Sequence, residues 1–199
     1  MICWRIWRGR WLAYKAKAGH PLRCARCLLD AFMILLVKRF LLRPTVPLWK
    51  YCLLAFPLAL VPSILLALIA RQVFVMLGAN VDLISAPDLK ATMGEFFGAV
   101  VFAPVTETLA LALLIVALSR LSQRTLFIAV VSAILWGSLH GTFGALWFFG
   151  TAWSFFVFSC AYLHWRKQSF GRAFLAASVP HALVNATAIS CLALASYAK

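Results

Sequence analysis

Four polar side chains stand out within long apolar stretches of the chain: Glu107, His140, His181 and Asn185. An ionisable residue in a membrane-spanning helix costs about 2.5–3.5 kcal/mol on insertion scales, so such residues usually face other helices and serve a function. A carboxylate and an imidazole can hold one water and accept its proton. A second imidazole and a carboxamide can donate hydrogen bonds to the oxyanion of an attacked carbonyl. These residue types therefore predict a hydrolytic site inside a membrane.

The same side chains leave two other interpretations open. Glu107, His140 and His181 supply one carboxylate and two imidazoles, which is a ligand set of zinc hydrolases. The His-Glu-x-x-His motif of zincins is absent from the sequence. Glu107 taken alone is equally compatible with a structural carboxylic acid, hydrogen-bonded to Thr106 or to another helix. We expect no resident cofactor, and zinc remains an alternative.

Helical spacing predicts how these residues are positioned. His140 follows Trp136 by four residues and Asn185 follows His181 by four, so each pair lies on one face of a helix. Ser178 lies one turn before His181 on the same side. We therefore expect the polar faces of these helices to meet in one pocket with a cytoplasmic or lateral entrance.

Proline and glycine mark two places where the backbone has a special role. Pro104 comes one turn before Glu107 and leaves a helix carbonyl without its amide partner, which a nearby hydroxyl or a water can satisfy. Gly137 and Gly141 have GxxxG spacing, which favours the close approach of a neighbouring helix. We interpret these two glycines as packing residues.

The composition indicates a membrane protein. The 199-residue chain is 64% hydrophobic, has a mean hydropathy of +0.94 and contains only 12% charged residues, which excludes an ordinary soluble domain. Spanning segments need about 20 mainly apolar residues. We predict an all-α polytopic transmembrane helix bundle with five spans at about 48–70, 94–118, 125–141, 145–164 and 173–197.

The charge is strongly asymmetric, with a formal net charge of +14. Basic clusters occur before residue 51, at 120–124 and at 166–172, which the positive-inside rule places on the cytoplasmic side together with the N-terminus. Membrane lipid is the expected partner, and nucleic acid is not, because the rest of the chain is too apolar. Residues 1–47 are predicted to form a basic, tryptophan-rich interfacial region, and residues 48–199 the transmembrane catalytic bundle.

At these positions the chain resembles the CPBP family of intramembrane endopeptidases, also called the CAAX-protease and bacteriocin-processing (Abi) family. Its motifs EExxxR, FxxxH and HxxxN/H are matched by Glu107, by Trp136 with His140, and by His181 with Asn185. The resemblance implies that Glu107 and His140 activate water and that His181 and Asn185 stabilise the oxyanion. It also implies a membrane-associated peptide or protein substrate and a location in a bacterial inner membrane.

The chain departs from the family motifs at three positions. Thr108 replaces the second glutamate, Ala112 the arginine, and Trp136 the phenylalanine. Thr108 and Trp136, together with Ser178, are expected to support the site or the substrate. Because the Glu/Arg pair of the first motif is missing, the resemblance implies prenylated substrates less strongly. Two alternatives remain, a non-catalytic immunity or scaffold protein of the same fold and a proton-coupled carrier.

Overall fold

The computed structural model describes residues 40–42, 45–85 and 92–197, and the predicted interfacial region at 1–47 lies almost entirely outside them. Within the described ranges the chain forms helices joined by short connections, without any strand. The prediction of an all-α transmembrane bundle is confirmed, because helices of membrane-spanning length and composition make up most of these residues.

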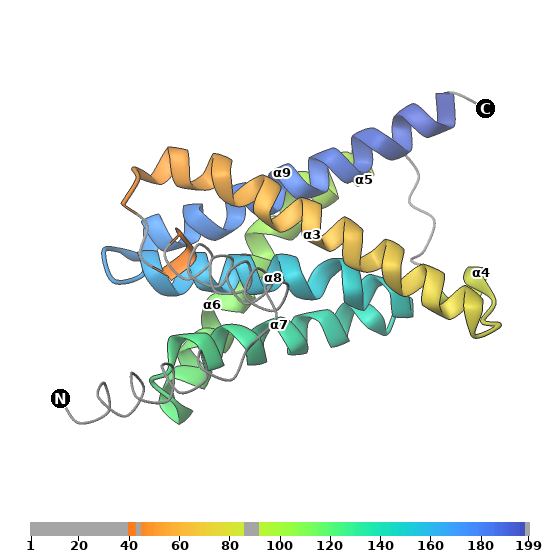
Figure 1. Ribbon diagram of the computed structural model, residues 1–199. Coiled ribbons are helices and arrows are strands. Elements are labelled where there is room, and N and C mark those ends of the chain that lie inside the picture. Colours follow the sequence, from red (N-terminus) through yellow and green to blue (C-terminus); the bar gives the residue numbers. More distant parts are fainter. Residues whose placement is uncertain (1–39, 43–44, 86–91, 198–199) are drawn as a thin grey trace, which may run out of the picture. The chain divides into compact units, whose positions relative to one another are not determined.

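The predicted spans correspond closely to the observed helices. The segment expected at 125–141 is a helix with the same bounds, while the first span extends six residues beyond its predicted end. In the part of the chain that is described, four helical segments are long enough to cross a membrane, and Thr125–Gly141 is shorter. In chain order the elements are α3 (Leu48–Met76), α4 (Val81–Ile84), α5 (Met93–Phe97), the π-helix η1 (Gly98–Phe102), α6 (Ala103–Leu121), α7 (Thr125–Gly141), α8 (Ala145–Trp165) and α9 (Phe170–Tyr197) (Figure 1).

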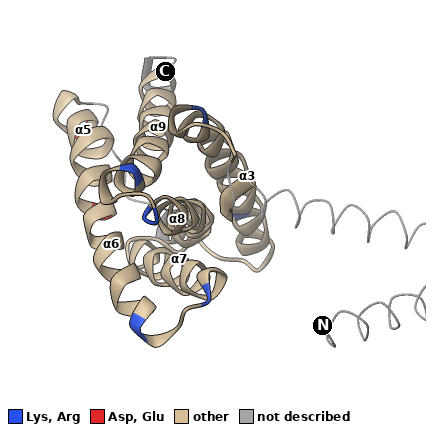
Figure 2. Cartoon of the chain, turned by 90° about the vertical axis from the view of Figure 1, so that its left-hand side faces the viewer, with Lys and Arg blue, Asp and Glu red and all other residues tan. Residues whose placement is uncertain are grey.

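Helix α8 lies at the centre of the bundle, with α3, α6, α7 and α9 around it (Figure 2). Half of its most apolar window is buried, against 22–33% in the other three spans. Large side chains such as Phe158 and Leu163 on α8 are almost completely buried. The other helices thus pack around α8, and this packing positions their polar residues.

Helices α3 and α8 run antiparallel and contact each other along their length. The rings of Tyr51 and Trp165 meet edge to face at 5.7 Å near one end. Further along, the hydroxyls of Ser63 and Ser154 are hydrogen-bonded at 2.8 Å. These contacts place the start of α3 beside the end of α8.

A proline inside α3 explains another contact with α8. Pro62 has no N–H, so the carbonyl of Leu58, four residues earlier, lacks its usual helical partner. The indole N–H of Trp153 on α8 donates a 2.8 Å hydrogen bond to this carbonyl. A side chain of a neighbouring helix thus satisfies the backbone group that the proline leaves free.

The two glycines of the GxxxG segment lie where α7 packs against α8, as predicted. A Cβ atom at Gly137 would come within 2.8 Å of the Cβ of Ala152, and one at Gly141 within 3.2 Å of the Cβ of Phe148. Any larger side chain at Gly137 would therefore force the helices apart. This close packing fixes the end of α7, where His140 is located.

Basic residues gather at one end of the bundle, the end that faces the viewer in Figure 2. This end comprises the α6–α7 and α8–α9 connections and the start of α3, and we call it the basic end. The opposite end comprises the α7–α8 turn and the end of α3 (Figure 1). Apart from Arg71 on α3, the lysines and arginines of the described residues lie at the basic end: Lys50, Arg120, Arg124, Arg166, Lys167 and Arg172.

Candidate active site

Glu107, His140, His181 and Asn185 line one cavity of about 390 Å³, which we call the site cavity. The walls are formed by residues of α3, η1, α6, α7, α8 and α9. The sequence predicts that these four side chains meet, and the structure brings them together from three separate helices. The candidate site therefore lies inside the bundle, at the level of the apolar spans.

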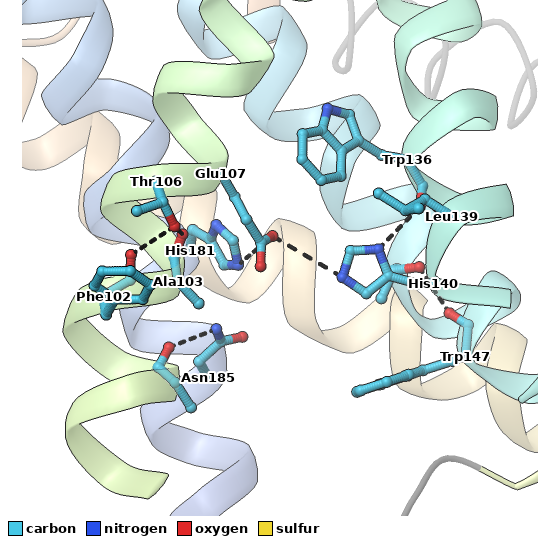
Figure 3. Close-up of polar contacts among 12 residues, drawn as sticks. Phe102, Ala103, Thr106, Glu107, Trp136, Leu139, His140, Trp147, His181 and Asn185 are labelled. Atoms are coloured by element: carbon cyan, nitrogen blue, oxygen red, sulfur yellow. Dashed lines mark hydrogen bonds and ion pairs between the residues drawn. The ribbon is translucent and has the colours of Figure 1, made fainter. Parts of the chain in front are cut away.

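The carboxylate of Glu107 lies between the two imidazoles (Figure 3). Its Oε2 atom is 3.9 Å from Nε2 of His140 and 3.8 Å from Nε2 of His181. This oxygen is buried and accepts no hydrogen bond from the residues that the structure describes. Both distances exceed a direct hydrogen bond, and one water with bonds of about 2.8 Å to each atom can span either of them.

The ring of His140 is oriented by its own helix. Its Nδ1 lies 2.9 Å from the backbone carbonyl oxygen of Trp136. A carbonyl oxygen only accepts hydrogen bonds, so Nδ1 carries the proton and donates it. In the neutral ring, Nε2 then presents its lone pair towards Glu107. The indole of Trp147 packs edge to face against this ring at 5.6 Å.

His181 is held by aromatic rings on α8. It is only 5% exposed, and its imidazole stacks on Phe158 with centroids 4.9 Å apart. Phe155 contacts the same ring edge to face at 5.5 Å. These contacts direct Nε2 towards Glu107 and exclude water from the other side of the ring.

Asn185 satisfies a backbone carbonyl that Pro104 leaves without a partner. The N–H of Ala103 bonds to Gly98 in the π-helix pattern, so the carbonyl of Ala99 would next require the N–H of residue 104, which proline lacks. The side-chain amide of Asn185 donates a 2.7 Å hydrogen bond to the Ala99 carbonyl. Helix α9 is thereby joined to the helical segment that carries Glu107.

Thr106, the neighbour considered as a partner for Glu107, bonds elsewhere. Its hydroxyl donates to the carbonyl of Phe102 at 2.9 Å, with a second contact of 3.3 Å to Ala103 (Figure 3). The hydroxyl is thus used by its own helix. This geometry does not support a structural role for Glu107 through Thr106.

The predicted support residues Thr108, Trp136 and Ser178 are not among the residues that line the site cavity. Thr108 and Ser178 are buried, at 3% and 6% exposure. The indole of Trp136 stacks on Phe155 with centroids 4.8 Å apart, and its buried N–H has no hydrogen-bond partner. Trp136 contacts the site through the hydrogen bond between its backbone carbonyl and His140 and through a tilted contact between the two rings, with centroids 6.0 Å apart.

Sequence reasoning missed several polar and aromatic side chains of the cavity. Trp147, Thr151 and Ser154 line it from α8, and Ser63 lines it from α3. The α8 residues follow each other at spacings of four and three, so they lie on one helix face. That spacing is visible in the sequence and was a usable signal for this wall.

As placed, the Glu107 carboxylate is farther from each imidazole than two ligands of one zinc ion are from each other. Zinc ligands about 2.0–2.1 Å from a tetrahedral ion lie about 3.3 Å from each other. The carboxylate of Glu107 is 3.8–3.9 Å from both imidazole nitrogens. No group of three or more His, Cys, Asp or Glu side chains in the described part of the chain is arranged to hold an ion.

Comparison of the chain with protein-family models, with curated proteins and with solved structures gave no match.

Proposed function

We propose that the protein is an intramembrane endopeptidase of the CPBP type, the family that its motifs resemble. The observation that carries the proposal is the Glu107 carboxylate, placed between two imidazoles inside a bundle of apolar helices. Carboxylate and histidine side chains at this depth are costly, and in one cavity they form an acid–base unit.

In the proposed reaction Glu107 and His140 activate one water. The water donates its protons to Oε2 of Glu107 and to the Nε2 lone pair of His140, and its oxygen attacks the peptide carbonyl carbon. One water proton moves to this Glu107–His140 pair as the C–O bond forms. The pair returns that proton to the amine nitrogen as the C–N bond breaks, which leaves a new carboxyl terminus and a new amino terminus.

His181 is the proposed donor to the oxyanion. Its ring is fixed between Phe155 and Phe158 with Nε2 facing the cavity, and a proton on Nε2 would meet negative charge developing on the carbonyl oxygen. The Asn185 amide carries two N–H groups, of which one is used for Ala99. The second is available for the oxyanion role that the family resemblance implies.

The substrate is proposed to be a membrane-associated peptide or protein, because the cavity lies within membrane-spanning helices. The basic residues at one end favour contact with anionic lipid, and a bacterial inner membrane fits this charge pattern and the family resemblance. The apolar walls of the cavity, including Leu60, Ile64 and Val184, suit hydrophobic side chains beside the cleaved bond.

New peptide termini in cell membranes test this proposal. Membranes from cells that express the wild-type protein should contain termini that are missing from cells expressing Glu107→Gln, because the amide keeps the shape but cannot accept a proton. Glu95→Gln is the matched control, since Glu95 lies on α5 and does not line the site cavity. Identical termini with wild type and Glu107→Gln would favour the non-catalytic interpretation.

A further inference from the structure

The exposure of the cavity-lining residues changes systematically along α8. Ser154, Phe155 and Phe158, which lie towards the basic end, are 4%, 2% and 1% exposed. Trp147 and Gly150, which lie towards the α7–α8 turn, are partly exposed. Among the described residues, the α8 wall of the cavity is therefore buried towards the basic end and partly exposed towards the opposite end.

Helix α3 shows the same gradient although it runs in the opposite direction. Between the basic end and the cavity, the buried residues of α3 include Tyr51, Ala59 and Ser63. Beyond them, Ile64 lines the cavity with 47% exposure, and Ala67 is partly exposed. Ala70 is an exception, because it is buried again at 7%. The wall from α3 thus opens in the same direction as the wall from α8.

Helix α9 agrees with these two helices. His181 is 5% exposed, Asn185 is partly exposed, and Ala188 is exposed although it still lines the cavity. Ile189 is an exception, because it is buried again at 4%. Three helices from different parts of the sequence therefore indicate one mouth, on the side away from the basic end.

The length of α7 explains why the mouth lies there. Its 17 residues span about 25 Å, whereas the hydrocarbon layer is about 30 Å thick. His140 lies in the last turn of α7, and the turn that follows contains Phe143, which is 62% exposed. A helix of this length that starts at the basic end is shorter than the hydrocarbon layer, which places His140 towards the opposite end of the bundle.

We propose that the site cavity opens to the non-cytoplasmic side of the membrane and that its substrate carries the cleaved bond in that half of the bilayer. The positive-inside rule assigns the basic end to the cytoplasm, and the mouth faces away from it. This differs from the cytoplasmic or lateral entrance expected from the sequence. The direction of the mouth follows from geometry and charge, and the statement about the substrate rests on the proposed function.

Single reporter cysteines in sealed membrane vesicles test the direction of the mouth. Gln123→Cys in the α6–α7 connection marks the basic end, and Thr142→Cys in the α7–α8 turn marks the opposite end. Ala188→Cys and Thr151→Cys report on the cavity. The buried native thiols Cys52 and Cys160 stay in place, and the remaining four cysteines are replaced by serine. A small, membrane-impermeant methanethiosulfonate is applied to one side, and free thiols are then counted after denaturation with a maleimide gel shift.

Both cavity cysteines should be blocked by reagent on the side that blocks Thr142→Cys, and should stay free when the reagent is on the side that blocks Gln123→Cys. In intact cells Gln123→Cys should react only after permeabilisation. Reaction of the cavity cysteines from the basic end, from both sides equally or from neither side would overturn the proposal. Reaction of both markers from one side would also overturn it, because the bundle would then not cross the membrane as assigned.

The labelling is repeated in the Glu107→Gln background to separate this proposal from the proposed function. The pattern should be unchanged, because water access to the cavity does not require catalysis. Unchanged labelling together with identical peptide termini would refute the endopeptidase and leave the direction of the mouth standing. Termini that depend on Glu107 and lie in cytoplasmic segments of their proteins would refute the statement about the substrate alone.

Discussion

The side-chain amide of Asn185 donates a 2.7 Å hydrogen bond to the backbone carbonyl of Ala99, which Pro104 leaves without a helical partner. This bond joins α9, which carries His181, to the helical segment that carries Glu107. The carbonyl that Pro104 leaves free thus becomes the acceptor of a bond between the two helical segments of the site. Asn185 is a positioning residue in this respect, whatever its second N–H contributes.

Removing the donor should destabilise the protein while keeping its packing volume. Asn185→Leu leaves the Ala99 carbonyl unsatisfied within the bundle and should lower the free energy of unfolding by about 1–3 kcal/mol. The measurement is the thermal unfolding of the purified protein in detergent. Cleavage should fall as well, because Glu107 loses its fixed position relative to His181.

Thr187→Val is the matched control for this substitution. Thr187 lies two residues further along α9, and its hydroxyl bonds only to the Leu183 carbonyl of its own helix. Its loss should change the free energy of unfolding by less than about 0.5 kcal/mol. Equal unfolding temperatures for Asn185→Leu and Thr187→Val would show that the bond to Ala99 contributes nothing.

Two glycine substitutions should have opposite effects on stability. Gly137→Ala places a Cβ atom 2.8 Å from that of Ala152, and such overpacking costs about 1–3 kcal/mol. At Gly171, no atom lies within 4 Å of a new Cβ, so Gly171→Ala should stabilise α9 by up to about 1 kcal/mol. Thermal unfolding of both variants checks the sign, and stabilisation by Gly137→Ala would contradict the close packing of α7 on α8.

Glu107 and His140 should behave as one unit in kinetics. If they share one water, Glu107→Gln and His140→Ala should each reduce cleavage to the same residual rate, and the double variant should be no slower. His164→Asn is the control, because His164 binds the Leu42 carbonyl through Nδ1 and does not line the site cavity. Single-variant losses that multiply in the double variant would show that the two residues act independently.

Metal removal should leave cleavage unchanged. The separations of Glu107 from His140 and His181 exceed those of ligands that share a zinc ion. Purified protein should therefore keep its rate in a strong chelator, and its zinc content should not depend on Glu107. Stoichiometric zinc that is lost together with activity on chelation would support the metallopeptidase version instead.

Much of the fold and of the site could be predicted because insertion into a membrane imposes simple rules. The helix Thr125–Gly141 matches the segment predicted at about 125–141, although it is shorter than the other predicted spans. Glu107, His140 and His181 were predicted to meet because buried polar side chains face other helices. These inferences need only the residue type and its place along a helix.

The remaining features depend on how the helices are rotated against each other. Trp136 was expected to support the site, and its ring stacks on Phe155 while it also contacts His140; the contact of Trp147 with His140 was not predicted. The bond from Asn185 to Ala99 requires the π-helix, in which backbone N–H groups bond to the carbonyl five residues earlier. Beyond Pro104, nothing in the sequence indicates this change. The short helix α4 was not predicted either, because four residues carry no periodicity.

The origin of the oxygen in the new carboxyl terminus tests the central claim most directly. Purified protein cleaves a substrate peptide in water labelled with a heavy oxygen isotope, under single-turnover conditions. If Glu107 activates water for direct attack, the label appears in the new carboxyl terminus and never in the Glu107 side chain, and Glu107→Gln yields no product. Label in Glu107 would show that its carboxylate attacks the substrate itself, and cleavage by Glu107→Gln at the wild-type rate would contradict the account as a whole.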